Sequence, residues 1–193
     1  KKKKPSFFLY LSSDAVYSDS RKKINEDSLT VPGSLHGIMH LCREIMFENV
    51  MKSKLCIVRP TLVYGDGDPH NGYGPNRFIR LIKKNKKISL FGKGEELRDH
   101  VWINDICKAI SKLIIKKKNG KFNLVTGKVI SFNEIAKQII KVTGKRNKIL
   151  YQKRKMPMPH GGFRAFQNSR FEKVFPRFKF KNFKEVSKYL YKR

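Results

Sequence analysis

The sequence predicts an α/β fold in which a parallel sheet is flanked by helices. An apolar run at residues 7–11 has the length of a buried strand and ends in a hydroxyl-rich turn. Apolar residues at residues 34–45 then recur at steps of three and four, which is typical of an amphipathic helix capped by Ser34. A short run at residues 55–58, ended by Pro60, has the continuous apolar pattern of a buried parallel strand.

Helices and strands continue to alternate along the rest of the chain. Residues 61–76 are rich in glycine and predict a long loop of the kind that carries ligands in open α/β sheets. Ser131 and Glu134 form a capping-box pattern before a helix that Gly144 ends. The predicted elements are a helix at 78–82, a strand at 88–91, a helix from 104 or 105, a strand at 122–125, a helix at 135–142, an edge strand at 149–151, a loop at 156–162 and helices at 169–175 and 182–191.

The composition carries a formal net charge of +29 over 193 residues. A charge of this sign would suit a nucleic acid, because lysine and arginine neutralise phosphates. However, 32 of the 44 basic residues are lysines spread over predicted helix faces and loops rather than gathered on one stripe. We therefore expect a solvated basic surface that attracts anionic substrates, and no specific nucleic-acid partner.

Cysteine usage and hydropathy indicate the compartment. Cys42, Cys56 and Cys107 lie in apolar segments without a Cys-x-x-Cys spacing, which predicts buried, reduced thiols. The apolar run at residues 7–11 is too short for a signal peptide, and no run approaches membrane-spanning length. We expect a cytoplasmic protein without a membrane segment.

Titratable side chains gather where the first strand meets the first helix. The strand ends in Ser13 and Asp14, and the helix carries His36, His40 and Glu44 one turn apart on one face. This pattern indicates an acid–base site. The same helical spacing could present metal ligands, but no second pair of ligands accompanies it, so we expect no metal.

Four motifs, in order, resemble those of the extended short-chain dehydrogenases, the NAD-dependent epimerase/dehydratase family. Ser-Ser-Asp-Ala-Val-Tyr at 12–17 resembles the family's Ser-Ser-x-x-Val-Tyr-Gly, and Arg-Pro-Thr-Leu-Val-Tyr-Gly at 59–65 resembles its Arg-Pro-x-x-Val-Tyr-Gly. Phe-Gly-Lys-Gly at 91–94 and Arg-Asp-His-Val-Trp-Ile-Asn-Asp at 98–105 resemble its next pair. The resemblance covers residues 7 to about 115.

The family's catalytic Tyr-Gly-x-x-Lys motif has a modified counterpart. His-Gly-Ile-Met-His at 36–40, with Glu44, matches its spacing, glycine and glutamate, but His36 replaces the tyrosine and His40 the lysine. The resemblance implies that Ser13 hydrogen-bonds the substrate oxygen and that Asp14 occupies an acidic position of the dehydratases. His36 would exchange the proton, since imidazole titrates near neutrality, and His40 would support it or bind the cofactor ribose.

The resemblance implies a partial Rossmann-type parallel sheet with flanking helices and a small C-terminal substrate lobe. Residues 1–65 would form the second half of the nucleotide-binding domain, residues 66–99 and 145–193 the lobe, and residues 100–144 the return to the domain. No Gly-x-x-Gly-x-x-Gly or Gly-x-Gly-x-x-Gly loop stands between a strand and a helix, so the loop that binds the pyrophosphate of NAD or NADP is absent from this chain. We therefore expect a C-terminal fragment that binds the cofactor poorly by itself.

The resemblance also implies which residues bind ligands. For the cofactor these are Ser12, Tyr17, Pro60 and Val63, of which the last two would lie against the nicotinamide. For the substrate they are Asn76, Arg77, Arg98 and Arg164, with Arg98 on the nucleotide diphosphate. Leu62 stands where the sugar-nucleotide epimerases have asparagine.

The predicted function is that of an NAD(P)-dependent epimerase or reductase acting on a sugar, in particular a nucleotide sugar. Ala15 replaces a glutamate that the dehydratases use, which argues against that activity. Two alternatives stay open: a non-catalytic binding or regulatory protein that has lost its catalytic pair, and a basic nucleic-acid-binding protein. A homodimer is compatible with the sequence, which does not decide the oligomeric state.

Overall fold

The computed structural model describes residues 6–145 and 148–191, and the strands among them form three sheets. The first has the order β1-β2-β6, all parallel, from β1 (Phe8–Leu11), β2 (Leu55–Pro60) and β6 (Gly120–Leu124). In the second, β5 (Leu97–Trp102) pairs in parallel with β3 (Leu62–Tyr64) and β9 (Phe163–Arg164) and antiparallel with β7 (Val129–Ser131). In the third, β4 (Ile88–Phe91) pairs in parallel with β8 (Ile149–Gln152).

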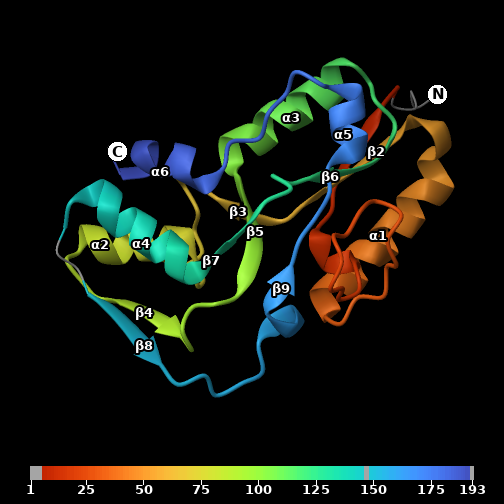
Figure 1. The fold of residues 1–193 in the computed structure, drawn as a ribbon. Helices are drawn as coiled ribbons and strands as arrows, with labels where there is room; N and C mark the ends of the chain where they lie inside the picture. Colours follow the sequence, from red (N-terminus) through yellow and green to blue (C-terminus); the bar gives the residue numbers. More distant parts are fainter. Residues whose placement is uncertain (1–5, 146–147, 192–193) are drawn as a thin grey trace.

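Helices cover these sheets in two groups. Figure 1 shows α2, α4 and α6 together at one end of the molecule, with α3 and α5 at the other. The helices are α1 (Leu35–Met51), α2 (Pro75–Lys83), α3 (Ile103–Ile115), α4 (Phe132–Thr143), α5 (Ser169–Val174) and α6 (Phe183–Tyr191), with 3₁₀ turns η1 (Asp14–Val16), η2 (Lys52–Lys54) and η3 (Pro159–Gly162).

Each helix group closes its own apolar core. One core packs Phe78 and Ile82 of α2 against Phe132 of α4 and Val186 of α6. The other packs α3 and α5 against β2, β5 and β6 through residues such as Leu113. The mixed α/β fold with parallel strands and flanking helices agrees with the prediction.

Helix boundaries follow the capping residues that the sequence indicated. The Ser34 hydroxyl accepts a hydrogen bond from the backbone N–H of Gly37 at 3.2 Å, which starts α1. Ser131 and Glu134 form the reciprocal capping box of α4, and Gly144 ends that helix in a left-handed conformation at φ 65°. These local predictions are confirmed.

Several other local predictions are wrong. Residues 61–76 are not one loop, because they contain β3 and the start of α2. The sequence analysis also missed β5, β7 and β9. Of the three cysteines only Cys56 is buried, which raises the pKa of its thiol to about 12, whereas Cys42 and Cys107 are exposed.

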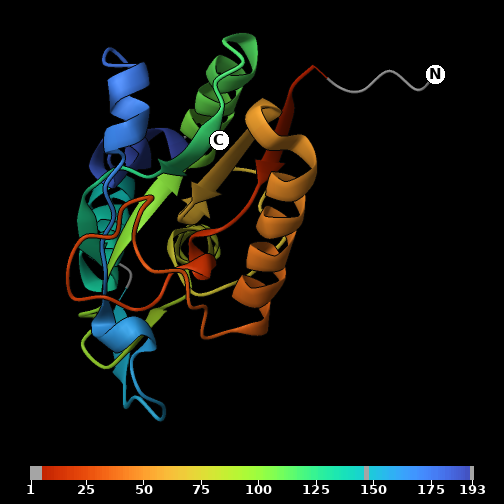
Figure 2. The same ribbon diagram turned by 90° about the vertical axis from the view of Figure 1, so that its right-hand side faces the viewer.

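α1 does not bury the apolar stripe that its sequence pattern suggested. Leu35 is 72% exposed and Val50 76%, whereas the buried residues of this helix are Gly37 and Glu44. In Figure 2, α1 lies at the side of the molecule with its outer face uncovered. A Cβ atom at Gly37 would lie 2.2 Å from the Ala15 carbonyl oxygen, so glycine is what allows α1 to approach the turn after β1.

A buried ion pair fixes α1 on the sheet. Arg59 of β2 donates from Nε to Oε1 of Glu44 at 2.9 Å and from Nη2 to Oε2, and both side chains are at most 1% exposed. The Ser12 hydroxyl donates to Glu44 Oε1 at 2.5 Å. The Arg59 guanidinium also lies over the Tyr17 ring, 4.7 Å from its centroid. Glu44 therefore joins α1, β2 and the end of β1.

We predict that Glu44→Gln destabilises the protein by about 3–5 kcal/mol, because it leaves the buried charge of Arg59 without a counter-ion. Urea unfolding at neutral pH measures this change. Glu48→Gln is the matched control on the same helix: Glu48 pairs with Lys121 at 2.8 Å but is 42% exposed. The control variant should lower the free energy of unfolding by less than about 1 kcal/mol. Equal losses in the two variants would contradict the importance given to Glu44.

Candidate active site

A polar cavity of about 670 Å³ opens between the turn after β1, the start of α1, β3, β5 and the segment of η3 and β9. It brings together residues that are far apart in the sequence. Of the predicted site residues it is lined by Ser13, Asp14 and His36 (catalytic), Tyr17 and Val63 (cofactor), and Arg98 and Arg164 (substrate).

The remaining predicted residues lie elsewhere. Ser12 is buried against Glu44, and Pro60 is the last residue of β2. The Asn76 side chain stabilises the loop before α2: it accepts a hydrogen bond from the Gly65 N–H at 3.1 Å and donates one to Asp68 at 2.9 Å. Arg77 is exposed on α2 and lines none of the three cavities described here.

Ser13 presents a hydroxyl group at the entrance to η1. It is the N-cap of that turn, and its Oγ accepts a hydrogen bond from the Ala15 N–H at 3.1 Å. The hydroxyl proton is directed at Asp14 Oδ1 over 3.5 Å, the outer limit of a hydrogen bond. Because this bond is weak, the proton can be given to a ligand oxygen in the cavity.

Arg164 holds the same turn from the C-terminal part of the chain. Its guanidinium donates to the backbone oxygens of Asp14 at 2.6 Å and Tyr17 at 3.2 Å, and to the carboxylates of Asp14 at 3.3 Å and Asp19 at 3.0 Å. The residue is 1% exposed. With its donors directed at these oxygens, Arg164 is suited to positioning Asp14 rather than to gripping a ligand.

The two histidines of α1 differ in their surroundings. His36 is exposed and lines the polar cavity, and its ring meets the His40 ring edge-on with centroids 4.6 Å apart. His40 is partly buried, with Nδ1 2.8 Å from the Tyr10 hydroxyl. Burial and the neighbouring His36 lower the pKa of His40 and favour its neutral form. Among the two, His36 is the group placed to exchange a proton in the cavity.

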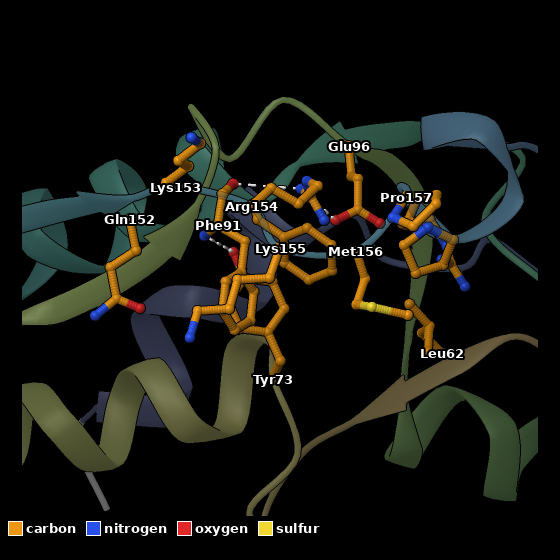
Figure 3. A pocket seen from close by; sticks show the side chains of 13 residues that line it. Leu62, Tyr73, Phe91, Glu96, Gln152, Lys153, Arg154, Lys155, Met156 and Pro157 are labelled. Carbon is orange, nitrogen blue, oxygen red and sulfur yellow. Dashed lines mark hydrogen bonds and ion pairs between the residues drawn. The ribbon is translucent and has the colours of Figure 1, made fainter.

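A second cavity, of about 850 Å³, adjoins the first and has aromatic walls (Figure 3). The Tyr73 ring lies 5.1 Å from that of Phe91 and 4.6 Å from that of Phe132, measured between centroids. Arg154 crosses the cavity and donates to Glu96 at 2.9 Å. The aromatic walls of this cavity were not predicted from the sequence, where only Phe91 was marked, as part of the Phe-Gly motif.

Arg98 is shared by both cavities. Within the described residues no hydrogen bond or ion pair engages its guanidinium group. Burial lowers the pKa of Arg98 from its usual range, and the nearby carboxylate of Asp14 opposes this change. A cation that is partly desolvated and has no fixed counter-ion attracts an anionic ligand strongly.

His100, which was not singled out in the sequence, is a buried titratable group close to these cavities. Its ring is 3% exposed and lies edge-on to Phe132 at 5.4 Å between centroids. Nδ1 lies 3.2 Å from the Arg98 carbonyl oxygen, and Nε2 has no hydrogen-bond partner among the described residues. Burial lowers the pKa of His100 to about 3, so its imidazole is neutral at physiological pH.

The comparison with protein families decides where this chain belongs. A model of the NAD dependent epimerase/dehydratase family matches residues 1–125, more than half of the chain. The chain belongs to this family. The predicted resemblance is thereby confirmed.

Solved structures share the fold. A UDP-N-acetylglucosamine 4-epimerase from Methanobrevibacter ruminantium, in complex with UDP-N-acetylmuramic acid, is similar at a TM-score of 0.86 and 20% identity, over 97% of this chain and 62% of that one. A UDP-glucuronic acid 4-epimerase from Bacillus cereus, in complex with UDP-glucuronic acid and NAD, has a TM-score of 0.84 and 22% identity, over 99% of this chain and 62% of that one. RMD from Pseudomonas aeruginosa, complexed with NADPH, has a TM-score of 0.79 and 16% identity, over 96% of this chain and 65% of that one. The chain thus spans less than two thirds of the length of each.

Two other features are absent from the part of the chain that the structure describes. In residues 6–145 and 148–191 no helix is long and apolar enough to cross a membrane. The same residues contain no group of three or more histidine, cysteine, aspartate or glutamate side chains arranged to hold a metal ion. Glu44, which shares a helix face with His36 and His40 in the sequence, is bonded to Arg59 instead.

We predict that His100 makes the protein sensitive to acid. Because its pKa is about 3 in the folded state and about 6.5 when unfolded, the unfolded chain binds the proton more tightly between these values. Stability is therefore lost as the pH falls from 6.5 towards 3, by up to about 1.4 kcal/mol per pH unit. Urea unfolding from pH 7 to pH 4.5 should show a smaller loss in His100→Phe than in the wild type. Parallel curves would refute the prediction.

Proposed function

We propose that this chain carries the substrate-binding and proton-transfer residues of an NAD(P)-dependent nucleotide-sugar epimerase. The observation that carries the proposal is the position of Arg98, a cation that is shared by an aromatic cavity and a polar cavity and has no hydrogen-bond or ion-pair partner among the described residues. A nucleoside diphosphate sugar has the matching order of groups: an aromatic base, an anionic diphosphate and a hydroxyl-rich ring. The similar 4-epimerase structures with bound UDP-sugars support this choice.

The aromatic cavity would take the base. Tyr73, Phe91 and Phe132 offer ring faces and edges for stacking, and aromatic groups stack on any base. Lys153 and Lys155 line the same cavity beside Arg154, so the surrounding potential is positive (Figure 3). A basic, aromatic-walled cavity suits a nucleotide better than a neutral sugar.

Arg98 would bind the diphosphate. A guanidinium group offers several N–H donors in one plane, which matches two oxygens of a phosphate. In Arg98 these donors are not engaged by the described residues, whereas those of Arg154 and Arg164 are directed at Glu96 and at Asp14. The sugar would then extend into the polar cavity.

In the polar cavity, Ser13 and His36 would handle the proton. Ser13 donates its weakly held hydroxyl proton to the substrate oxygen and so polarises it. His36 takes the proton from the substrate hydroxyl and later returns it, which imidazole does well near neutral pH. Arg164 keeps the turn of Ser13 and Asp14 in place.

The residues present fit one end of the cofactor. Val63, 41% exposed in the polar cavity, offers an apolar surface for a nicotinamide. Tyr17 fits less well as a direct ligand, since it is 2% exposed and its hydroxyl donates to Asn123 at 2.7 Å. NAD or NADP, when bound, supplies the acceptor and donor of a hydride. We also propose residues 1–65 and 100–144 as part of the nucleotide-binding domain, and residues 66–99 and 145–193 as the substrate lobe.

We predict that Arg98→Met weakens UDP binding roughly 10- to 100-fold, because it removes charge-assisted hydrogen bonds to phosphate. Isothermal titration of the 193-residue chain with UDP measures the dissociation constant. Arg77→Met is the matched control, since it removes an arginine from the exposed side of α2 outside the cavities. A similar loss in both variants would point to general charge attraction and argue against a diphosphate site at Arg98.

A kinetic experiment tests the roles of His36 and Ser13 in proton transfer. In the complete enzyme with NAD, His36→Phe and Ser13→Ala should each lower kcat for C4 epimerisation of UDP-glucose about 10²- to 10⁴-fold. Ser111→Ala, which truncates an exposed serine of α3 outside all three cavities of the structure, should leave kcat unchanged. An unchanged kcat in His36→Phe would exclude His36 from the proton transfer, whereas a wild-type protein without activity would favour the non-catalytic, nucleotide-sugar-binding alternative.

A further inference from the structure

A third cavity, of about 260 Å³, lies beside the two described above and has no role in the proposed reaction. It is bordered by β3, by the loop that follows β3, by the first turn of α2 and by His100 of β5. We call it the His100 cavity. Leu62 lines all three cavities, so this one lies next to both the aromatic and the polar cavity.

The hydrogen bonding of His100 defines what the cavity can bind. A carbonyl oxygen only accepts, so the contact between Nδ1 and the Arg98 carbonyl places the single proton of the neutral ring on Nδ1. Nε2 therefore carries a lone pair and is an acceptor. It is buried and without a partner among the described residues, although buried polar atoms are nearly always hydrogen-bonded.

The other walls of the cavity narrow the choice of ligand. Asp68 already accepts hydrogen bonds from the Asn76 side chain and the His70 N–H, both at 2.9 Å, and pairs with Arg80, so the cavity holds no uncompensated carboxylate to attract a cation. The N-cap of α2 is Gly74, which makes no side-chain capping bond. The positive end of this helix favours an oxygen at the cavity.

We propose that His100 is a specificity-determining residue whose Nε2 accepts a hydrogen bond from a neutral O–H or N–H donor of the substrate. A sugar hydroxyl group or an acetamido N–H has this chemistry, and a hydroxyl oxygen would also face the N-terminus of α2. This inference rests on the proposed function, because it assigns the group to the glycosyl part of a nucleotide sugar. It adds that a residue other than Ser13 and His36 determines which sugar is bound.

The test compares UDP with UDP-glucose on the 193-residue chain. His100→Phe keeps the ring volume and the contact with Phe132 but removes the acceptor. We expect its dissociation constant for UDP to stay within about twofold of the wild type, which also shows that the variant is folded. Its affinity for UDP-glucose should fall about 5- to 10-fold, the effect of one hydrogen bond between neutral groups.

Two further measurements separate recognition from a structural role. His100→Gln, whose amide oxygen is an acceptor at a similar reach to Nε2, should recover part of the lost affinity for UDP-glucose. In protein with ¹⁵N-labelled histidine, the Nε2 resonance of His100 should move on addition of UDP-glucose and stay in place on addition of UDP. A residue that merely supports the fold would show neither the selective recovery nor the selective shift.

The outcomes distinguish this inference from the function on which it rests. Equal weakening of UDP and UDP-glucose in His100→Phe, or no weakening of either, would overturn the role of His100 and leave nucleotide-sugar binding intact. Wild-type chain that binds neither UDP nor UDP-glucose would overturn the proposed function itself, and the role of His100 with it.

Discussion

The buried pairing of Glu44 with Arg59 is the constraint on which the site depends. A carboxylate with no solvent exposure is tolerated only with its charge compensated and its oxygens hydrogen-bonded, and Arg59 and Ser12 meet both needs. Because Ser12 precedes Ser13 and Glu44 lies two turns beyond His36, this one pairing sets the helix of His36 against the turn of Ser13. Gly37 then permits the close contact with Ala15. The packing of α1 thus fixes where His36 lies relative to Ser13, and it buries little apolar surface.

The candidate ligand site consists of three neighbouring cavities that share lining residues and differ in their chemistry. Aromatic rings occupy one end, hydroxyl and imidazole groups the other, and Arg98 stands between them. All three cavities have walls from the paired strands β3 and β5, to which Leu62 and either Arg98 or His100 belong. These two strands therefore hold the walls of the three cavities in fixed positions relative to one another.

Local signals in the sequence predicted those elements whose ends are fixed by short-range hydrogen bonds, such as α1 at Ser34 and α4 at Ser131. They failed for β5, because Arg98, Asp99 and His100 interrupt its apolar pattern. Asp99 is nevertheless fully buried, as it accepts bonds from Thr126 and from the Gly127 N–H. The motifs singled out Ser13, His36 and Arg98, which line one cavity of the structure. The aromatic cavity could not be predicted, since Tyr73, Phe91 and Phe132 meet only through tertiary packing.

The contacts of Arg164 with Asp14 have a consequence for biosynthesis. The two residues are 150 positions apart, so the turn that carries Ser13 is completed by a segment that is synthesised long after the turn itself. Contacts between such distant residues form late, after the shorter loops have closed. A nascent chain of this protein therefore holds β1, α1 and β2 long before it holds an ordered turn at Ser13. The turn is therefore fully held in place only after Arg164 has been synthesised.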